Sequence, residues 1–246
     1  MGKRLENKIA LITGGAAGFG KGTAAVLKRE GAKVYISDIN KEGGEKVASE
    51  LGVSFFEHDV TDPERWQEVI AEIKTADNQL NILVNNAGIG YMGDVEGTTN
   101  EAWDLVHKVD LDSVFYGCKY ALPLMRDSGN GSIINISSIF GLVAGQKRTV
   151  YSMTKFGVEG LTKGMALDLA KYNIRVNTVC PTFVVTPMTK KFLKDKKFKR
   201  ETLNNIPLGR FAELSEVSSA VVFLASDAAS MITGTSLLID GGWTAK

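Results

Sequence analysis

Short apolar runs alternate with amphipathic stretches along the whole chain, and this alternation is the feature that most constrains the fold. The runs are rich in β-branched and aliphatic residues and cover residues 9–13, 33–38, 53–60, 82–86, 132–137, 174–180 and 236–240. Helical patterns lie between most of them, over residues 20–30, 41–51, 63–75, 100–127, 152–172 and 213–225. Apolar strands that alternate with helices predict a parallel sheet wound on both faces. We therefore expect one α/β domain over residues 1–246, built on a seven-stranded, doubly wound parallel sheet.

Residues 186–210 break this alternation. The segment follows a strand, is rich in lysine and contains no clear sheet element. A long insertion after the carboxyl end of a strand is typical of a lid, so we expect a substrate lid here. A solvated helix face is the simpler interpretation of its basic residues, and steering of an anionic substrate is the alternative. These residues are Lys190, Lys191, Lys194, Lys196, Lys197, Lys199 and Arg200.

Composition excludes several classes of partner. The formal net charge of +1 gives no reason to expect nucleic acid or an acidic membrane as partner. No apolar run reaches the roughly 20 residues that span a bilayer, and the N-terminus has no signal-peptide pattern. Cys118 and Cys180 lie in apolar contexts, which favours core cysteines in a reducing compartment over a disulfide or a metal site. We expect a cytoplasmic protein.

Tyr151 and Lys155 lie four residues apart in a predicted helix, and Ser138 precedes the tyrosine. Positions i and i+4 share one helix face, so the Lys155 ammonium can stabilise a phenolate. A free phenol, with a pKa of about 10, is otherwise a poor acid or base at neutral pH. The Ser138 hydroxyl could hold a substrate oxygen against the phenol. Together these residues predict a proton-transfer site for an alcohol or a carbonyl.

A glycine-rich turn, TGGAAGFG, follows the first predicted strand and precedes a helix. Gly14, Gly18 and Gly20 would let the backbone approach a pyrophosphate that rests on the helix N-terminus. The second predicted strand ends at Asp38, whose carboxylate can accept hydrogen bonds from both adenosine ribose hydroxyls. It would also repel a 2′-phosphate, so the pattern predicts NAD rather than NADP. A cap on the next helix is the alternative role for Asp38.

Further polar and small residues follow the third and fourth predicted strands. Asp59 and Val60 follow the third strand, and Asn86, Ala87 and Gly88 follow the fourth. Ligands bind at the carboxyl ends of the strands in open α/β sheets. We expect Asp59 to hold the adenine amine and the Ala-Gly pair to let the cofactor pass, with an Asx turn as the alternative for Asn86.

Together these motifs resemble those of the classical short-chain dehydrogenase/reductase family. The matching residues run in the family order over essentially the whole chain: Thr13, Gly14, Gly18, Phe19, Gly20, Asp59, Val60, Asn85, Asn86, Ala87, Gly88, Ser138, Tyr151, Lys155, Pro181, Thr186, Ile239, Asp240, Gly241 and Gly242. The resemblance implies a Rossmann-like domain, hydride transfer with a nicotinamide cofactor and, commonly, a homotetramer. It also adds Ile39, Pro181 and Val184 to the expected cofactor site.

The resemblance implies a role for each catalytic residue as well. The tyrosine that matches Tyr151 is the general acid and base. The lysine that matches Lys155 makes that tyrosine more acidic and binds the nicotinamide ribose, and the serine that matches Ser138 polarises the substrate oxygen. Thr186 would bind the nicotinamide carboxamide. Local backbone capping is the alternative for Ser138 and Thr186.

Three positions depart from the family pattern. Asp110 stands where the family usually has an asparagine that helps to hold a water of the proton relay behind the lysine. A charge there would stabilise protonated Lys155 and disfavour the phenolate, so we expect an alkaline pH optimum. Phe19 replaces an aliphatic residue of the glycine turn, which we interpret as a change in packing. Thr182 replaces the glycine that follows Pro181.

Arg148 lies just before Tyr151, in the stretch that usually lines the substrate pocket of the family. A guanidinium binds a carboxylate or a phosphate through two parallel hydrogen bonds. We expect Arg148 to anchor an anionic small-molecule substrate. The alternative is an arginine at the surface or at a tetramer interface.

These observations favour an NAD-dependent dehydrogenase of a small secondary alcohol, with a hydroxy acid or an acidic sugar derivative as the expected substrate. The second hypothesis is a 3-oxoacyl-(acyl carrier protein) reductase. Asp38 argues against it because that reaction usually uses NADPH, and the basic segment 186–210 argues for it because the carrier is acidic. The third is a cofactor-binding regulator without catalysis, which the intact Ser138, Tyr151 and Lys155 disfavour.

Overall fold

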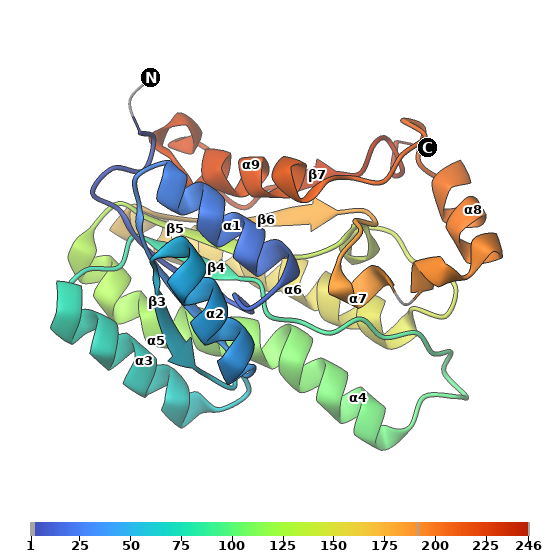
Figure 1. Ribbon diagram of the computed structural model, residues 1–246, viewed down its shortest axis with the longest axis horizontal. Helices are drawn as coiled ribbons and strands as arrows, with labels where there is room; N and C mark the ends of the chain where they lie inside the picture. The colour runs from blue at the N-terminus through green and yellow to red at the C-terminus, as the bar shows by residue number, and fades with distance from the viewer. Residues whose placement is uncertain (1–2, 191, 246) are drawn as a thin grey trace.

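A single seven-stranded sheet forms the centre of the molecule (Figure 1), and the computed structural model describes residues 3–190 and 192–245. All neighbouring strands pair in parallel, in the order β3-β2-β1-β4-β5-β6-β7. The strands are β1 (Ile9–Thr13), β2 (Lys33–Asp38), β3 (Ser54–Glu57), β4 (Ile82–Asn85), β5 (Gly131–Ile136), β6 (Ile174–Pro181) and β7 (Ser236–Ile239). The predicted doubly wound α/β fold is confirmed.

Helices cover both faces of the sheet because successive side chains of each strand point to opposite sides. Ala10 and Ile12 of β1 pack on one side, with α1 (Gly18–Arg29), α2 (Lys41–Leu51) and α9 (Leu214–Ala225). Ile9 and Leu11 pack on the other side, with α3 (Pro63–Asp77), α5 (Ser113–Ser128) and α6 (Thr149–Leu169). Within the described residues, no helix is long and apolar enough to cross a membrane.

The strand order reverses at β1, which lies between β2 and β4. Such a reversal opens a crevice beyond the carboxyl ends of the two diverging strands. The segment predicted as a lid lies at this edge of the sheet (Figure 1), and its described part is mostly helical up to Asn204 and then forms turns. It contains α7 (Pro187–Lys190), a 3-10 turn (Phe192–Lys194) and α8 (Lys196–Asn204), whereas Lys191 lies outside the described residues.

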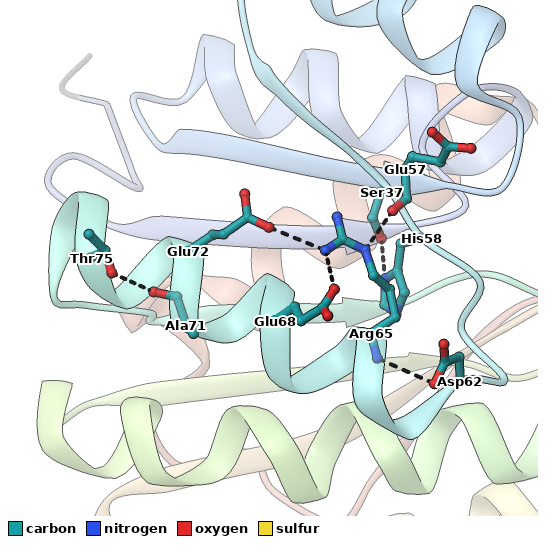
Figure 2. Close-up of polar contacts among 9 residues, drawn as sticks. All are labelled: Ser37, Glu57, His58, Asp62, Arg65, Glu68, Ala71, Glu72 and Thr75. Atoms are coloured by element: carbon teal, nitrogen blue, oxygen red, sulfur yellow. Dashed lines mark hydrogen bonds and ion pairs between the residues drawn. The ribbon is translucent and has the colours of Figure 1, made fainter.

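One predicted strand is shorter in the structure. β3 ends at Glu57 and not at residue 60, because the Asp59 carboxylate turns the chain by accepting hydrogen bonds from the Thr61 amide at 2.9 Å and from its hydroxyl at 2.8 Å. Asp62 then caps α3 by accepting from the Arg65 amide at 3.3 Å. The Arg65 side chain in turn donates to the Glu57 carbonyl at 2.9 Å (Figure 2). The end of β3 is thereby tied to the start of α3.

The helix predicted over residues 100–127 is interrupted. α4 (Asn100–His107) continues into a π-helical turn, Lys108–Asp112, before α5 begins. A π-helical turn inserts a residue into the helix and often marks a functional site. This turn brings Asp110 into the interior, beneath the start of α6. α6 itself begins at Thr149, so Tyr151 and Lys155 share one regular helix.

Candidate active site

A cavity of about 300 Å³ opens at the carboxyl edge of the sheet. Its wall is built from the turns that follow β1, β4, β5 and β6, together with the first turn of α6. Most of the residues predicted for the site lie on this wall: Gly14, Gly18, Phe19, Asp38, Asn86, Ala87, Gly88, Ser138, Arg148, Tyr151, Pro181, Val184 and Thr186. Residues far apart in sequence are therefore brought together as the motif spacing predicted.

Six predicted residues lie away from the cavity wall. Ile39 is 69% exposed, and Asp59 is exposed in the turn that follows β3. Val60 is a core residue whose carbonyl accepts a hydrogen bond from the Trp66 indole at 2.9 Å. Gly20 lies within α1, and Lys155 and Asp110 are buried behind the wall. These last three can act on a ligand only through their neighbours or after a local change.

The glycine turn is packed so tightly that side chains would not fit in it. Gly14 has a φ of +66°, and a Cβ on Gly20 would lie 2.0 Å from the Gly14 carbonyl oxygen. The Asn86 side chain donates to the carbonyls of Thr13 at 2.8 Å and of Gly14 at 3.2 Å. Asn86 thus bridges the ends of β4 and β1. The resulting cradle, with the N-terminus of α1 behind it, fits a pyrophosphate.

Asp38 joins the end of β2 to this turn. Its Oδ2 accepts a hydrogen bond from the Ala16 amide at 3.0 Å, and its Oδ1 accepts from the Asn40 amide at 2.9 Å. The side chain that caps α2 is that of Asn40, which accepts from the Gly43 amide at 3.0 Å. Asp38 therefore does not cap α2, which was the alternative role predicted for it, and it lies on the cavity wall.

Tyr151 and Ser138 line the cavity, and Lys155 is buried beside the Tyr151 ring. The Lys155 Nζ is 5.6 Å from the centroid of the Tyr151 ring and donates to the Ile136 carbonyl at 3.2 Å. Ser138 follows β5 and is 7% exposed. Its Oγ accepts from the Phe140 amide at 3.2 Å, so it caps the short turn Ile139–Gly141 while it faces the cavity. The capping and catalytic interpretations are compatible, because the hydroxyl still has its own proton to donate.

Asp110 is completely buried beside Lys155. Its Oδ1 accepts from the Ile89 amide at 2.7 Å, and its Oδ2 lies 4.0 Å from the Lys155 Nζ without a hydrogen-bond partner among the described residues. Burial raises the pKa of Asp110, against the opposing effects of Lys155 and of the Ile89 amide. Burial lowers the pKa of Lys155, but the charge of Asp110 and the nearby Tyr151, Cys180 and Glu159 more than offset it, so the net change is upward.

The pKa values of Asp110 and Lys155 are both raised, so either group could carry the proton between them. We assign it to Lys155, because the Ile89 amide and the ammonium both favour a charged carboxylate at Asp110.

Arg148 precedes α6 and lies on the cavity wall, 6% exposed. It donates to the Tyr91 carbonyl at 2.9 Å. Its guanidinium carbon lies 5.6 Å from the ring centroids of Phe140 and Phe192 and 5.9 Å from that of Phe183. Within the described part of the chain no carboxylate lies within 4.0 Å of it. Burial lowers the pKa of Arg148, with Tyr151 opposing, but a guanidinium remains charged.

Sequence reasoning missed the aromatic part of the wall. Phe140, Phe183 and Phe192 line the cavity, and edge-to-face contacts join Phe140 to Tyr151 and to Phe183 with ring centroids 6.4 and 6.1 Å apart. Phe140 lies two positions after Ser138, and Phe183 lies two positions after Pro181. This closeness to predicted site residues is the sequence signal that could have indicated them. No three His, Cys, Asp or Glu side chains in the described residues gather to hold a metal ion.

Comparisons with known proteins agree with this geometry. A family model described as enoyl-(acyl carrier protein) reductase matches residues 14–244. The chain is 44% identical to trans-4-hydroxycyclohexanecarboxylate dehydrogenase of Sinomonas cyclohexanicum, over 98% of this chain and 95% of the relative. It is 42% identical to cyclopentanol dehydrogenase of Comamonas testosteroni, over 99% of both chains. The crystal structure of gox2181 superposes with a TM-score of 0.96 at 31% identity, over 99% of this chain and 98% of that one. The chain therefore belongs to the short-chain dehydrogenase/reductase family and is an oxidoreductase of secondary alcohols or ketones, a class that uses a nicotinamide cofactor.

Proposed function

We propose that the protein is an NAD-dependent dehydrogenase that oxidises the secondary alcohol of a small carboxylic acid. The observation that carries the proposal is the placement of Arg148. It is a buried cation that shares a cavity with Tyr151 and Ser138 and lacks a carboxylate partner among the described residues. Removing a charge from water without a counter-charge is costly, so a carboxylate supplied by the substrate would complete the site.

The shape of the cavity supports a compact substrate. Phe140, Phe183 and Phe192 lie around the guanidinium and give the cavity an apolar wall, and Phe140 also contacts the Tyr151 ring. The names of the two relatives denote alcohols on small carbon rings, one of which carries a carboxylate. A cyclic hydroxy acid is therefore the first substrate to test, ahead of short open-chain hydroxy acids and acidic sugar derivatives.

Each residue of the site would have a distinct task. Asp38, at the ribose end of the cradle, supports NAD over NADP because its carboxylate would repel a 2′-phosphate. When bound, the nicotinamide supplies hydride transfer. Ser138 would donate a hydrogen bond to the substrate oxygen, and Tyr151 would take the hydroxyl proton. Lys155 would stabilise the phenolate from behind, and Thr186 lies on the wall where the carboxamide is expected.

The experiment is a substrate panel measured with NAD and with NADP on the wild type and on Arg148→Ala. The panel contains trans-4-hydroxycyclohexanecarboxylate, 3-hydroxybutyrate, cyclohexanol and cyclopentanol. A charged hydrogen bond contributes about 1.5–3 kcal/mol, so kcat/KM for the acids should fall roughly 10- to 100-fold in the variant while neutral alcohols stay within about threefold. Equal losses for acids and neutral alcohols would refute the anchor. Arg126→Ala, at an exposed position, is the matched control.

A second function is favoured by one observation. The matching family model is described as an enoyl-(acyl carrier protein) reductase. The basic helix α8 packs on the cavity wall through Phe198, whose ring centroid lies 5.7 Å from that of Phe183, so an acidic carrier could dock beside the cavity. A 3-oxoacyl-(acyl carrier protein) reductase would prefer NADPH and a 3-oxoacyl thioester. Reduction of such a thioester with NADPH, faster than oxidation of every acid in the panel with NAD, would favour this function.

We also infer a homotetramer. Large apolar side chains are exposed on α4, α5 and α6, namely Trp103 at 44%, Leu105 at 55%, Phe115 at 46%, Phe156 at 48% and Leu167 at 82%. Exposed apolar surface of this kind supports contact with a second copy of the chain. Sedimentation equilibrium would test the number of copies, and a monomer at micromolar concentration would contradict it.

A further inference from the structure

Glu159 is a buried carboxylate that no catalytic motif uses. It lies one helical turn after Lys155 on α6 and is 4% exposed. Among the described residues it has no Lys, Arg or His within 4.0 Å. A carboxylate in such a place is costly unless several donors and a nearby positive charge stabilise it.

Three donors converge on this carboxylate. Its Oε1 accepts from the Cys180 thiol at 3.2 Å, and its Oε2 accepts from the hydroxyls of Thr178 at 3.0 Å and Ser236 at 2.6 Å. Burial, and then the charge of Glu159, raise the pKa of Cys180 to about 12, so the thiol keeps the proton that it donates. Only an ionised carboxylate offers acceptor sites to all of these donors while needing none itself.

The donors come from the two strands beneath α6. Thr178 of β6 pairs in register with Ser236 of β7, so Glu159 reaches across both strands at one level of the sheet. A Cβ on Gly141 would lie 2.6 Å from the Ser137 Oγ, 3.0 Å from the Lys155 carbonyl and 3.2 Å from the Glu159 Cγ. The turn that carries Ser138 therefore packs directly on the helical turn between Lys155 and Glu159.

The charged and titratable groups around Lys155 come from three elements. Asp110 faces it from the π-helical turn, Tyr151 and Glu159 from α6 itself, and Cys180 from β6. Asp110 and Glu159 are the two carboxylates of this group. Residues four apart on a helix are neighbours, so the charge of Glu159 acts on Lys155 at short range.

We propose that Glu159 is a positioning residue of the active site: its charge partly offsets that of the Lys155 ammonium at the Tyr151 phenol, and its hydrogen bonds fix α6 on β6 and β7 so that Tyr151 faces Ser138. This inference rests on the proposed dehydrogenase function for the roles of Tyr151 and Lys155. It gives Lys155 two nearby carboxylates, Asp110 and Glu159, where the sequence indicated one.

The test separates the charge from the hydrogen bonds. Glu159→Gln removes the charge and keeps a similar shape, whereas Ser236→Ala keeps the charge and removes one donor. In the pH profile of kcat, Glu159→Gln should move the acidic limb by about one pH unit toward acid, because removal of a negative charge favours the phenolate. Ser236→Ala should melt at a lower temperature with an unchanged limb. Asp168→Asn, at an exposed position of the same helix, should change neither.

A second readout does not depend on turnover. Ultraviolet difference titration follows the ionisation of the tyrosine whose signal disappears in Tyr151→Phe, and the same acid-ward shift is expected for Glu159→Gln. An unshifted titration in Glu159→Gln overturns the proposal even if the variant is less stable. If Glu159→Gln does not fold, Glu159→Met has a side chain of similar length without the charge and should give the same acid-ward shift, and an unshifted titration in it would also overturn the proposal. A wild type that titrates as expected but oxidises no alcohol would instead refute the proposed function.

Discussion

Asp110→Asn should make the enzyme work at lower pH. Asp110 is fully buried, and its Oδ2 lies 4.0 Å from the Lys155 ammonium without a hydrogen-bond partner among the described residues. Asparagine has nearly the same shape and removes the charge. Its carbonyl can still accept from the Ile89 amide, which the carboxylate accepts at 2.7 Å, so the local fold should survive.

The size of the shift follows from Coulomb's law. At an effective dielectric constant of about 20, a unit charge 4.0 Å away interacts with an ammonium by about 4 kcal/mol. For a phenolate taken at roughly 8 Å, the same charge would contribute about 2 kcal/mol. The latter corresponds to about 1.5 pH units. We therefore expect an acid-ward shift of about 1.5 units.

In the proposed mechanism oxidation needs the phenolate of Tyr151, and a negative charge nearby disfavours a second negative charge. Removing the charge of Asp110 therefore lets the phenolate form at lower pH, and the acidic limb of the kcat profile moves toward acid. The assay is the initial rate of NADH formation with saturating substrate from pH 6 to pH 11, with Asp112→Asn on the same π-helical turn as control. An unchanged limb, or an alkaline shift, would refute the electrostatic reasoning.

Three further predictions concern other parts of the site and the fold. Asp38→Ser should raise the ratio of kcat/KM for NADP over NAD at least about tenfold, because the repulsion of a 2′-phosphate is removed; an unchanged ratio in paired assays would contradict this. Gly20→Ala should weaken NADH binding, measured by fluorescence, because its Cβ would lie 2.0 Å from the Gly14 carbonyl oxygen, and wild-type affinity would show that the turn is not the cradle. His58 is buried beside Ser37 (Figure 2), and burial lowers its pKa to about 4. Below about pH 6.5 His58 is protonated in the unfolded chain but stays neutral in the folded protein. The free energy of unfolding should therefore fall by about 3 kcal/mol between pH 6.5 and pH 4. Over the same range the urea midpoint of His58→Phe should fall less steeply than that of the wild type.

Local sequence was sufficient for the sheet and for most of the cavity wall. Apolar runs bounded by helices predicted every strand, because a strand buried on both faces needs a continuous apolar run. The exception was the end of β3, where the side chain of Asp59 turns the chain within two residues. Hydrophobic pattern does not report such a side-chain hydrogen bond. The π-helical turn at Lys108–Asp112 was missed for the same reason, because it leaves the helical pattern almost unchanged.

The sequence by itself determined the family, the glycine cradle and the pairing of Tyr151 with Lys155, because these depend on short spacings that helix and turn geometry convert directly into proximity. Only the tertiary structure decided that Arg148 is buried on the cavity wall among Phe140, Phe183 and Phe192. It also decided that Glu159 receives donors from β6 and β7. The reason is physical: burial and the absence of a counter-charge are properties of all the neighbours of a side chain, and those neighbours come from segments far apart in the chain.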